Sequence, residues 1–437
     1  MKQVKNRSTF IKTIVCFLLL IAGMIPIRSV AAQETTEDLL SKVQRDSINY
    51  FLKYSHPKTG LIPDSNMPHA PASIAATGFS LIALVVAAEN QWLTYDEAYD
   101  KVKRTLFTLQ NKVQHERGFF YHFISTNSGK RIWESEASSI DTALCVASAL
   151  IAGQYFKDTI VEKLARSIYE RVEWDWMLNN THLFCHGYKP ESGFLPYYWD
   201  TYSEHLILHV LSIGALRHTV PSQCWSEWTR LEETYNGLPV IFAHSGSLFT
   251  YQFSHMFVDF RELSDNGIDY FTNSKNATLA NRAFCINSRD MHPTYGENIW
   301  GLSASLGPRG YKAYGARPGR AFHDGTIAPY AILSALPFCE EEALRSITYI
   351  YENYKDNVYS QCGFRDAFNL EENWVADHYI GIDQGITVGM IENYRSELIW
   401  RLFMELPSTT RWIERCNLIP DHQINPHTIM PREQEPV

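Results

Sequence analysis

The feature that most constrains the fold of this chain is a repeated alternation between apolar and amphipathic helical segments. Apolar segments start near Ser73, Ser138, Tyr202, Asn273, Thr326 and Asp383. Segments with one polar face lie between most of them, at residues 37–54, 94–110, 158–171 and 340–354. A helix that is apolar all round is buried, whereas an amphipathic helix covers a core with one face. The pattern predicts an all-α protein built as an (α/α)6 toroid, a barrel of inner helices inside an outer layer.

The last apolar segment carries acidic residues at its N-terminal end. Residues 377–403 begin with a loop that carries Asp377 and Asp383, and then continue without proline, with apolar residues at mixed three- and four-residue steps. This spacing predicts a buried helix with an acid at its N-terminal end. An aspartate in that place can cap the helix or act as a catalytic base, and capping is the commoner role.

Other ionisable residues fall at equivalent places. Because the inner helices of a toroid run parallel, the long loops before their N-termini gather at one rim, which here would carry Glu136, Asp141, Asp200, Glu204, His323, Asp324, Asp377 and Asp383. Several have aromatic neighbours in the chain, namely Trp133, Trp199, Trp374 and Tyr379. Glycoside hydrolysis needs one protonated and one ionised carboxyl group, and apolar walls with neighbouring acids separate their pKa values. The set fits a glycosidase, while each acid alone also fits a helix cap or a surface charge.

Aromatic composition points the same way without deciding the question. The chain has 11 Trp, 24 Tyr and 23 Phe, and exposed flat rings are natural surfaces for the C–H faces of sugars. An aromatic-rich helical core explains the same counts. Composition therefore favours a carbohydrate ligand only in combination with the acids.

The N-terminus has the features of an export signal. Basic residues precede an apolar stretch at residues 13–27, and Val30, Ala31 and Ala32 form a small-residue cleavage site. We expect a signal peptide at residues 1–32, a catalytic domain at 33–420 and a C-terminal tail at 421–437, with the mature protein periplasmic or secreted. Loss of five positive charges changes the net charge to −9 − 5 = −14. Such a charge argues against nucleic acids and acidic polysaccharides as partners, and so against a polysaccharide lyase.

Cysteines, metals and cofactors give weaker signals. Seven cysteines remain after the predicted cleavage and none forms a C-x-x-C pair, so disulfides are not the basis of the fold, although one or two bridges remain open. His205 and His209 are one helical turn apart, but Leu206 stands where a metalloprotease needs glutamate and no third ligand is marked. His205 is therefore taken as a core or substrate-contact residue. We expect no metal and no cofactor.

Several long motifs resemble a known family. The segments SIAATGFSLIAL, SSIDTAL, YYWDTYSEHLILHVLSIGA, DGTIAPYA and GIDQGITVGMIENYRSELIW look like the glucoamylase-like domain of glycoside hydrolase family 144, and like the related domain of cyclic β-1,2-glucan synthases. The likeness covers residues 38–418. It implies an (α/α)6 barrel that hydrolyses β-1,2-glucan by inversion, with a glutamate as general acid.

The resemblance also implies roles for particular residues. Glu204 matches the general acid, Glu136 and Asp141 match acids of the pocket, and Asp383 is expected to be the base or its partner. The substrate-binding candidates are Trp133, Trp199, Asp200, His205, His323, Asp324, Trp374, Asp377 and Tyr379. The segment from Tyr202 to His205 departs from the family's more usual Tyr-Asn-Glu.

The sequence thus predicts a secreted, monomeric glycoside hydrolase that cleaves neutral β-1,2-glucan or its oligosaccharides, by endo attack or by release of disaccharides. Two alternatives stay open at this point. One is a glucoamylase-like enzyme that cleaves α-glucan, because fold likeness does not settle the substrate. The other is a non-catalytic sugar-binding protein of a glycan-uptake system, which would keep the aromatic residues but need no pair of acids.

Overall fold

The computed structural model describes residues 36–420. The predicted signal peptide at residues 1–32 and the predicted tail at 421–437 lie outside the described residues. Two compact units are distinguished, Met1–Leu39 and Leu40–Val437, and the packing described below is that of the second. Within the described range, no helix combines the length and apolar character needed to cross a bilayer.

Helices make up most of the regular structure, which confirms the predicted helical class. They are α2 (Thr36–Tyr54), α3 (Ile74–Glu89), α4 (Tyr95–Asn111), α5 (Ser139–Tyr155), α6 (Ile160–Glu170), α7 (Leu206–Ile213), α8 (Gln223–Glu227), α9 (Phe249–Phe257), α10 (Tyr270–Asn287), α11 (Pro329–Leu333), α12 (Glu340–Val358), α13 (Gly381–Ser396), α14 (Leu398–Met404) and α15 (Pro407–Arg415), with one 3-10 helix at Trp174–Leu178.

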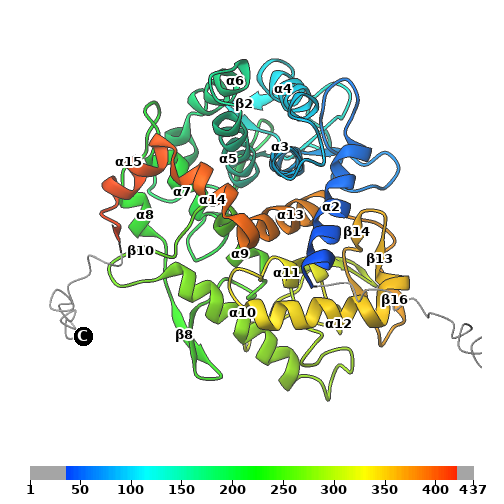
Figure 1. Ribbon diagram of the computed structural model, residues 1–437. Helices are drawn as coiled ribbons and strands as arrows, with labels where there is room; N and C mark the ends of the chain where they lie inside the picture. The colour runs from blue at the N-terminus through cyan, green and yellow to red at the C-terminus, as the bar shows by residue number, and fades with distance from the viewer. Residues whose placement is uncertain (1–35, 421–437) are drawn as a thin grey trace, which may run out of the picture. The chain divides into compact units, whose positions relative to one another are not determined.

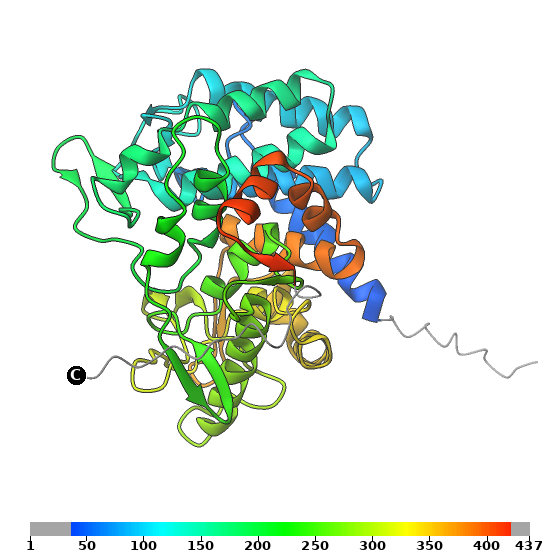
Figure 2. The ribbon, with the colours of Figure 1, turned by 90° about the vertical axis from the view of Figure 1, so that its left-hand side faces the viewer.

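The strands are short, and every pair of strands is antiparallel. The pairs are β1 (Ala72–Ser73) with β4 (Phe123–Ile124), β2 (His115–Glu116) with β3 (Phe119–Phe120), β8 (Glu232–Tyr235) with β9 (Leu238–Ile241), β11 (Ala304–Gly307) with β12 (Gly310–Ala313), β13 (Tyr359–Ser360) with β14 (Gly363–Phe364), and β15 (Phe368–Asn369) with β16 (Trp374–Val375). A three-stranded sheet joins β5 (Ala137–Ser138), β6 (Gly187–Lys189) and β7 (Gly193–Phe194). The last strand, β17 (Ile419–Pro420), pairs with β10 (Leu263–Ser264), which ties the end of the described chain to its middle (Figure 2).

Helices α3 and α5 form the centre of the packing and begin where the sequence predicts. Ser73 and Ser138 cap them, and each hydroxyl accepts a backbone N–H three residues further on. Both helices are buried over nearly their whole length. They pack against each other, α3 also packs against α13, and α5 also packs against α7 (Figure 1). The apolar segments are therefore inner helices, as predicted.

The prediction of the fourth inner helix is wrong. Helix α10, expected to be apolar all round from Asn273, is buried along one face only, as an outer helix is. The buried helix in this part of the chain is α9, in which every residue from Thr250 to Phe257 is buried and which contacts both α7 and α13. Its nine residues are too few to give a clear period in the sequence.

The last inner helix is also shorter than predicted. Instead of one helix through residue 403, α13 ends at Ser396 and α14 starts at Leu398, with Glu397 between them in the left-handed conformation at φ 57°. The carboxylate of Glu397 accepts a hydrogen bond from Arg261 at 2.7 Å. Glutamate rarely adopts this conformation, so the sequence carries no signal for the break.

We predict that Gly78→Ala destabilises the fold by about 1–3 kcal/mol, as overpacking does in a close helix contact. A Cβ at this position would lie 2.6 Å from the backbone Cα of Cys145 in α5, so the two helices must separate. Urea unfolding measures the loss. Gly296→Ala is the control, because a Cβ there meets nothing within 4 Å. Equal stability of the two variants would contradict the close α3–α5 contact.

Candidate active site

Three acids stand at the N-terminal ends of neighbouring inner helices. Asp141 lies in the first turn of α5, Asp383 in the first turn of α13, and Glu204 two residues before α7. All three side chains are buried or nearly so. Because α5 packs against α7 and α3 joins α5 to α13, acids that are far apart in the chain are held by one set of packed helices.

Glu204 has the properties of a proton donor. Its residue is 8% exposed, and the hydroxyl of Ser203 donates a hydrogen bond to its carboxyl group. Burial raises the pKa of Glu204; the bond from Ser203 opposes this shift and the negative charge of Asp141 adds to it. The net effect favours the protonated acid, the form that a leaving oxygen requires.

A histidine that the sequence analysis missed links two of the predicted acids. His122 lies between Glu136, at 3.1 Å from its Nδ1, and Asp141, at 3.8 Å from its Nε2. Burial lowers the pKa of His122, but Asp141 and Glu136 outweigh burial and raise it to about 9. The ligand atoms of these three residues lie within 4.8 Å of one another, close enough for a metal ion. Because each ring nitrogen faces a different carboxylate, a protonated histidine already provides the positive charge.

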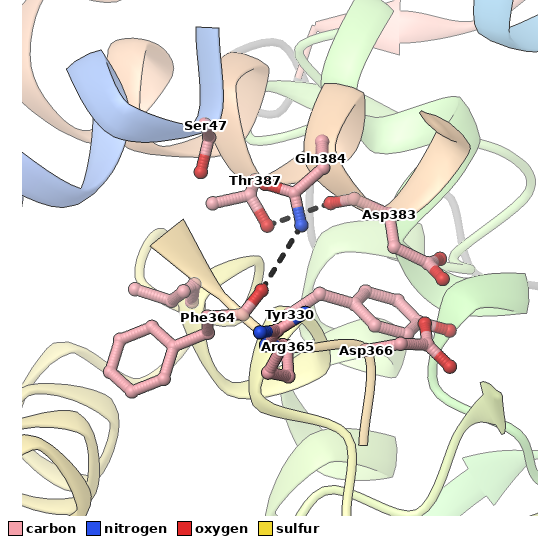
Figure 3. Close-up of a pocket in the computed structure, with 9 residues that line it drawn as sticks. Ser47, Tyr330, Phe364, Arg365, Asp366, Asp383, Gln384 and Thr387 are labelled. Atoms are coloured by element: carbon pink, nitrogen blue, oxygen red, sulfur yellow. Dashed lines mark hydrogen bonds between the residues drawn. The ribbon is translucent and has the colours of Figure 1, made fainter. Parts of the chain in front are cut away.

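Two further acids, half-buried Asp64 and buried Asp366, also escaped the sequence analysis. Burial raises the pKa of Asp64 to about 6, with His122 opposing the shift and Asp141 adding to it. The carboxyl groups of Asp366 and Asp383 line one small cavity and lie side by side in Figure 3. Asp64 comes from a turn-rich linker and Asp366 from the loop after β14, where no periodic pattern marks a buried acid.

The hydroxyl group of Tyr311, on β12, relates these acids to one another. The residue is 51% exposed, yet its hydroxyl end is desolvated, and the pKa of Tyr311 is raised well above its usual value by this desolvation and by the charges of Asp383, Asp366, Asp64 and Glu204, in that order. Coulombic interactions weaken with distance. The influence of both Glu204 and Asp383 on this one hydroxyl group indicates that they face the same region.

Comparisons with known proteins show which proteins the chain is similar to. Residues 196–407 match the family model described as "Glycoamylase: Putative glucoamylase". Over 425 residues the chain is 28% identical to an "Exo beta-1,2-glucooligosaccharide sophorohydrolase (non-reducing end)" of Parabacteroides distasonis, covering 88% of this chain and 58% of that protein. A putative glucoamylase structure from Bacteroides uniformis superposes with a TM-score of 0.84 at 29% identity, over 89% of this chain and 98% of that one.

A third relative is an endo-β-1,2-glucanase from Chitinophaga pinensis, solved with sophorotriose and glucose. It superposes with a TM-score of 0.82 at 25% identity, over 87% of this chain and 98% of that one. The predicted resemblance to hydrolases of β-1,2-glucan is confirmed. The chain spans 58% of the length of the curated relative from Parabacteroides distasonis.

The likeness to β-1,2-glucan hydrolases does not place every predicted site residue at the cluster of acids. The side chain of Asp377 is 84% exposed and bonds to His378; of the two, His378 is the one whose charge acts on Asp64 and Asp366. Asp324 accepts hydrogen bonds from Tyr314 at 2.9 Å and Thr326 at 2.6 Å, which brace its loop.

Four other candidates lie at the edge of the site or away from it. His323 packs edge-on against Phe284 and His292. Asp200 is exposed, and its backbone carbonyl accepts a bond from Thr229. Trp374 is half-buried in the β15–β16 hairpin. Trp133 is 69% exposed, contacts Phe123 at a ring distance of 5.4 Å and adopts a left-handed φ of 56°.

Two predicted substrate contacts are corrected by burial. His205 is fully buried, and its ring stacks near Trp199 and packs edge-on against Trp228. Tyr379 is 2% exposed. These two side chains support the site from the core. Trp199 is 9% exposed, about as much as Glu204, stacks on His186 at a ring-centroid distance of 3.9 Å and donates its indole N–H to Ser139.

We predict that the buried histidines make stability fall on the acid side. Burial lowers the pKa of His209 to about 3, so the unfolded chain, with a pKa near 6.5, takes up the proton first as the pH falls. The free energy of unfolding is not reduced by His209 above about pH 6.5, and it falls as the pH decreases from there toward pH 3. His209→Phe should remove up to about 1.4 kcal/mol of stability loss per pH unit in this window.

Chemical unfolding at several pH values measures this difference. His182→Phe is the control, because His182 is exposed. Parallel stability curves for His209→Phe and the wild type would contradict the prediction.

Proposed function

We propose that the protein is a glycoside hydrolase that cleaves β-1,2-glucan or its oligosaccharides. The observation that carries the proposal is the convergence of buried Glu204 with Asp383 around one region, each at the start of an inner helix. Burial and neighbouring acids favour the protonated form of Glu204. The names of two relatives, a β-1,2-glucooligosaccharide sophorohydrolase and an endo-β-1,2-glucanase, support the linkage.

In the proposed reaction Glu204 protonates the leaving glycosidic oxygen. The carboxyl group of Asp383 is the base that activates water, or the partner of that base. This division of work between two carboxyl groups is that of an inverting glycosidase. His122, with Glu136 and Asp141, forms a charged wall beside Glu204. Hydrogen bonds from such fixed groups orient sugar hydroxyls without reorganising during the reaction.

The proposal includes an (α/α)6 arrangement and export. The packing contacts run from α7 through α5, α3 and α13 to α11, a succession of inner helices that supports closure into a toroid. Residues 1–32 carry the basic, apolar and small-residue regions of a signal peptide, which supports a periplasmic or secreted enzyme. A monomer is the proposed state.

The direct test is incubation of the protein with β-1,2-, β-1,3- and α-1,4-glucans, followed by analysis of the products. We expect soluble products from β-1,2-glucan alone. A ladder of sizes would indicate endo cleavage, whereas disaccharide alone would indicate attack from a chain end. Products from α-1,4-glucan but not from β-1,2-glucan would overturn the proposed linkage.

We predict that Glu204→Gln lowers kcat by roughly 100- to 10,000-fold, the usual contribution of a general acid, while oligosaccharide binding is retained. The amide keeps the shape of the side chain but has no proton of suitable acidity to give. Initial rates and equilibrium binding measure the two effects separately. Glu352→Gln, on the exposed face of α12, is the control. Unchanged kcat in Glu204→Gln would favour a non-catalytic sugar-binding protein.

We predict that Trp133→Ala weakens binding of long oligosaccharides more than binding of disaccharides. Trp133 and Glu134 are consecutive residues with left-handed φ values of 56° and 51°, and such strain persists only where the surroundings hold it. The loop presents an exposed ring close in sequence to Glu136. Loss of one ring contact should raise KM about tenfold for long substrates. If KM changed equally for oligosaccharides of every length, Trp133 would not bind a sugar unit distant from the cleaved bond.

A further inference from the structure

The most unusual chemical feature of the described residues lies behind Asp383. Asp366 and Asp383 are each 1% exposed. They line one small cavity together with Tyr330, Arg365 and Gln384 (Figure 3). Its volume, about 10 Å³, is near the minimum that one water requires, so no sugar enters it.

The hydrogen bonds around the two carboxyl groups leave one buried oxygen of each group without a donor. Oδ2 of Asp366 accepts the backbone N–H of Leu306 at 2.7 Å. Oδ1 of Asp366 and Oδ2 of Asp383 are buried and accept no hydrogen bond, and each carboxyl group shifts the pKa of the other. Two carboxylate anions have no proton to donate. A proton held between them satisfies both groups.

We propose that Asp366 and Asp383 hold a single proton between them, and that Asp366 is the positioning residue that sets how readily Asp383 takes part in proton transfer. The shared proton stands on the geometry alone. Its catalytic consequence rests on the function proposed above.

The surroundings assign the proton to Asp383. Burial raises the pKa of Asp383 well above its usual value, and the charge and hydrogen bond of Asp366 raise it further. Burial also raises the pKa of Asp366, but the bonds from Asp383 and from the Leu306 N–H favour its anion. Two like charges this close do not both ionise in a buried site.

Other ionisable groups surround Asp366 and Asp383. The charge of Asp64 acts on Asp383 and that of His378 on Asp366. The charges of both acids act on the hydroxyl groups of Tyr311 and Tyr330, the charge of Asp383 also acts on Tyr50, and Arg365 lines the cavity. Tyr311 is paired across the β11–β12 hairpin with Leu306, so one hairpin both holds Asp366 and brings a hydroxyl to the acids.

In the reaction the pair acts as a monoanion that takes up one proton. The oxygen of water bonds to the anomeric carbon, the bond from that carbon to the leaving oxygen breaks, and Glu204 gives its proton to the leaving oxygen. The attacking water gives its proton to Asp383 as the shared proton moves to Asp366, so the pair becomes neutral while Glu204 becomes an anion. Exchange with solvent returns Glu204 and the pair to their starting states.

The first experiment needs no substrate. A group with a raised folded pKa holds a proton that the unfolded chain releases above about pH 4, so the pair makes the wild type lose stability as the pH rises. Asp366→Asn removes the neighbouring charge and offers Asp383 an amide donor, so it lessens this loss, although the burial of Asp383 remains. The Tm of this variant should increase relative to the wild type between about pH 5 and pH 8. Asp383→Asn should do the same, and the double variant should add no further pH dependence.

Asp356→Asn, an exposed aspartate of α12, is the matched control and should follow the wild type. A constant Tm difference across this pH range for both single variants would overturn the shared proton. If Asp366→Asn does not fold, Asp383→Asn tests the same pair. Because this result does not depend on activity, it separates the shared proton from the proposed function.

The second experiment tests the positioning role. Asp366→Asn leaves Asp383 with an amide donor in place of an anion, so the acid limb of the pH profile of kcat/KM should move to lower pH by at least about one unit, with KM nearly unchanged. An equal loss of activity at every pH would overturn the positioning role. A wild type that cleaves no glucan would overturn the proposed function and leave the stability result standing.

Discussion

The close packing of α3 against α5 and α13 is the constraint on which the site depends. Where Gly78 faces α5, a Cβ would lie 2.6 Å from a backbone atom, and Gly385 of α13 meets the ring of Phe79 in the same way. These glycines bring the starts of the helices together, and with them Asp141 and Asp383. The positions of the catalytic candidates are thus set by backbone contacts in the core, which are stiff, and not by surface loops.

Carboxylate groups that lie close together repel one another. In this structure some of the acids have a neighbouring positive charge that offsets the repulsion, and others do not. His122 places one positive charge against Glu136 and Asp141, whereas Asp366 and Asp383 have only each other and the N–H of Leu306. Glu204 accepts a hydrogen bond from the hydroxyl of Ser203 and forms no ion pair within residues 36–420. The same kind of side chain therefore has different proton affinities within one site, which is how acid and base roles are separated.

Sequence patterns predicted the parts of this arrangement that follow from helices. Ser73, Ser138 and the acids next to helix starts could be located, because capping and apolar periodicity mark them. Asp64, His122 and Asp366 lie in irregular segments, where burial depends on contacts with distant parts of the chain. His205 and Tyr379 were predicted to contact the substrate but are buried, because a sequence pattern does not tell which side chains meet solvent. Glu397 breaks a helix through a conformation that its residue type seldom adopts.

The division of the site along the chain explains why its chemistry cannot be assigned to one segment. The span that matches the glucoamylase-like family model contains Glu204, Asp366 and Asp383, which are the residues with protons to give or take. Asp64, His122 and Asp141 precede that span. The two groups act on each other electrostatically, since the charge of Asp141 raises the pKa of Glu204 and that of Asp64 raises the pKa of Asp383. Since Asp141 adds to the pKa shift of Glu204, the proton affinity of the acid inside the matched span depends on a carboxylate outside it, and the catalytic unit is the whole set of packed helices.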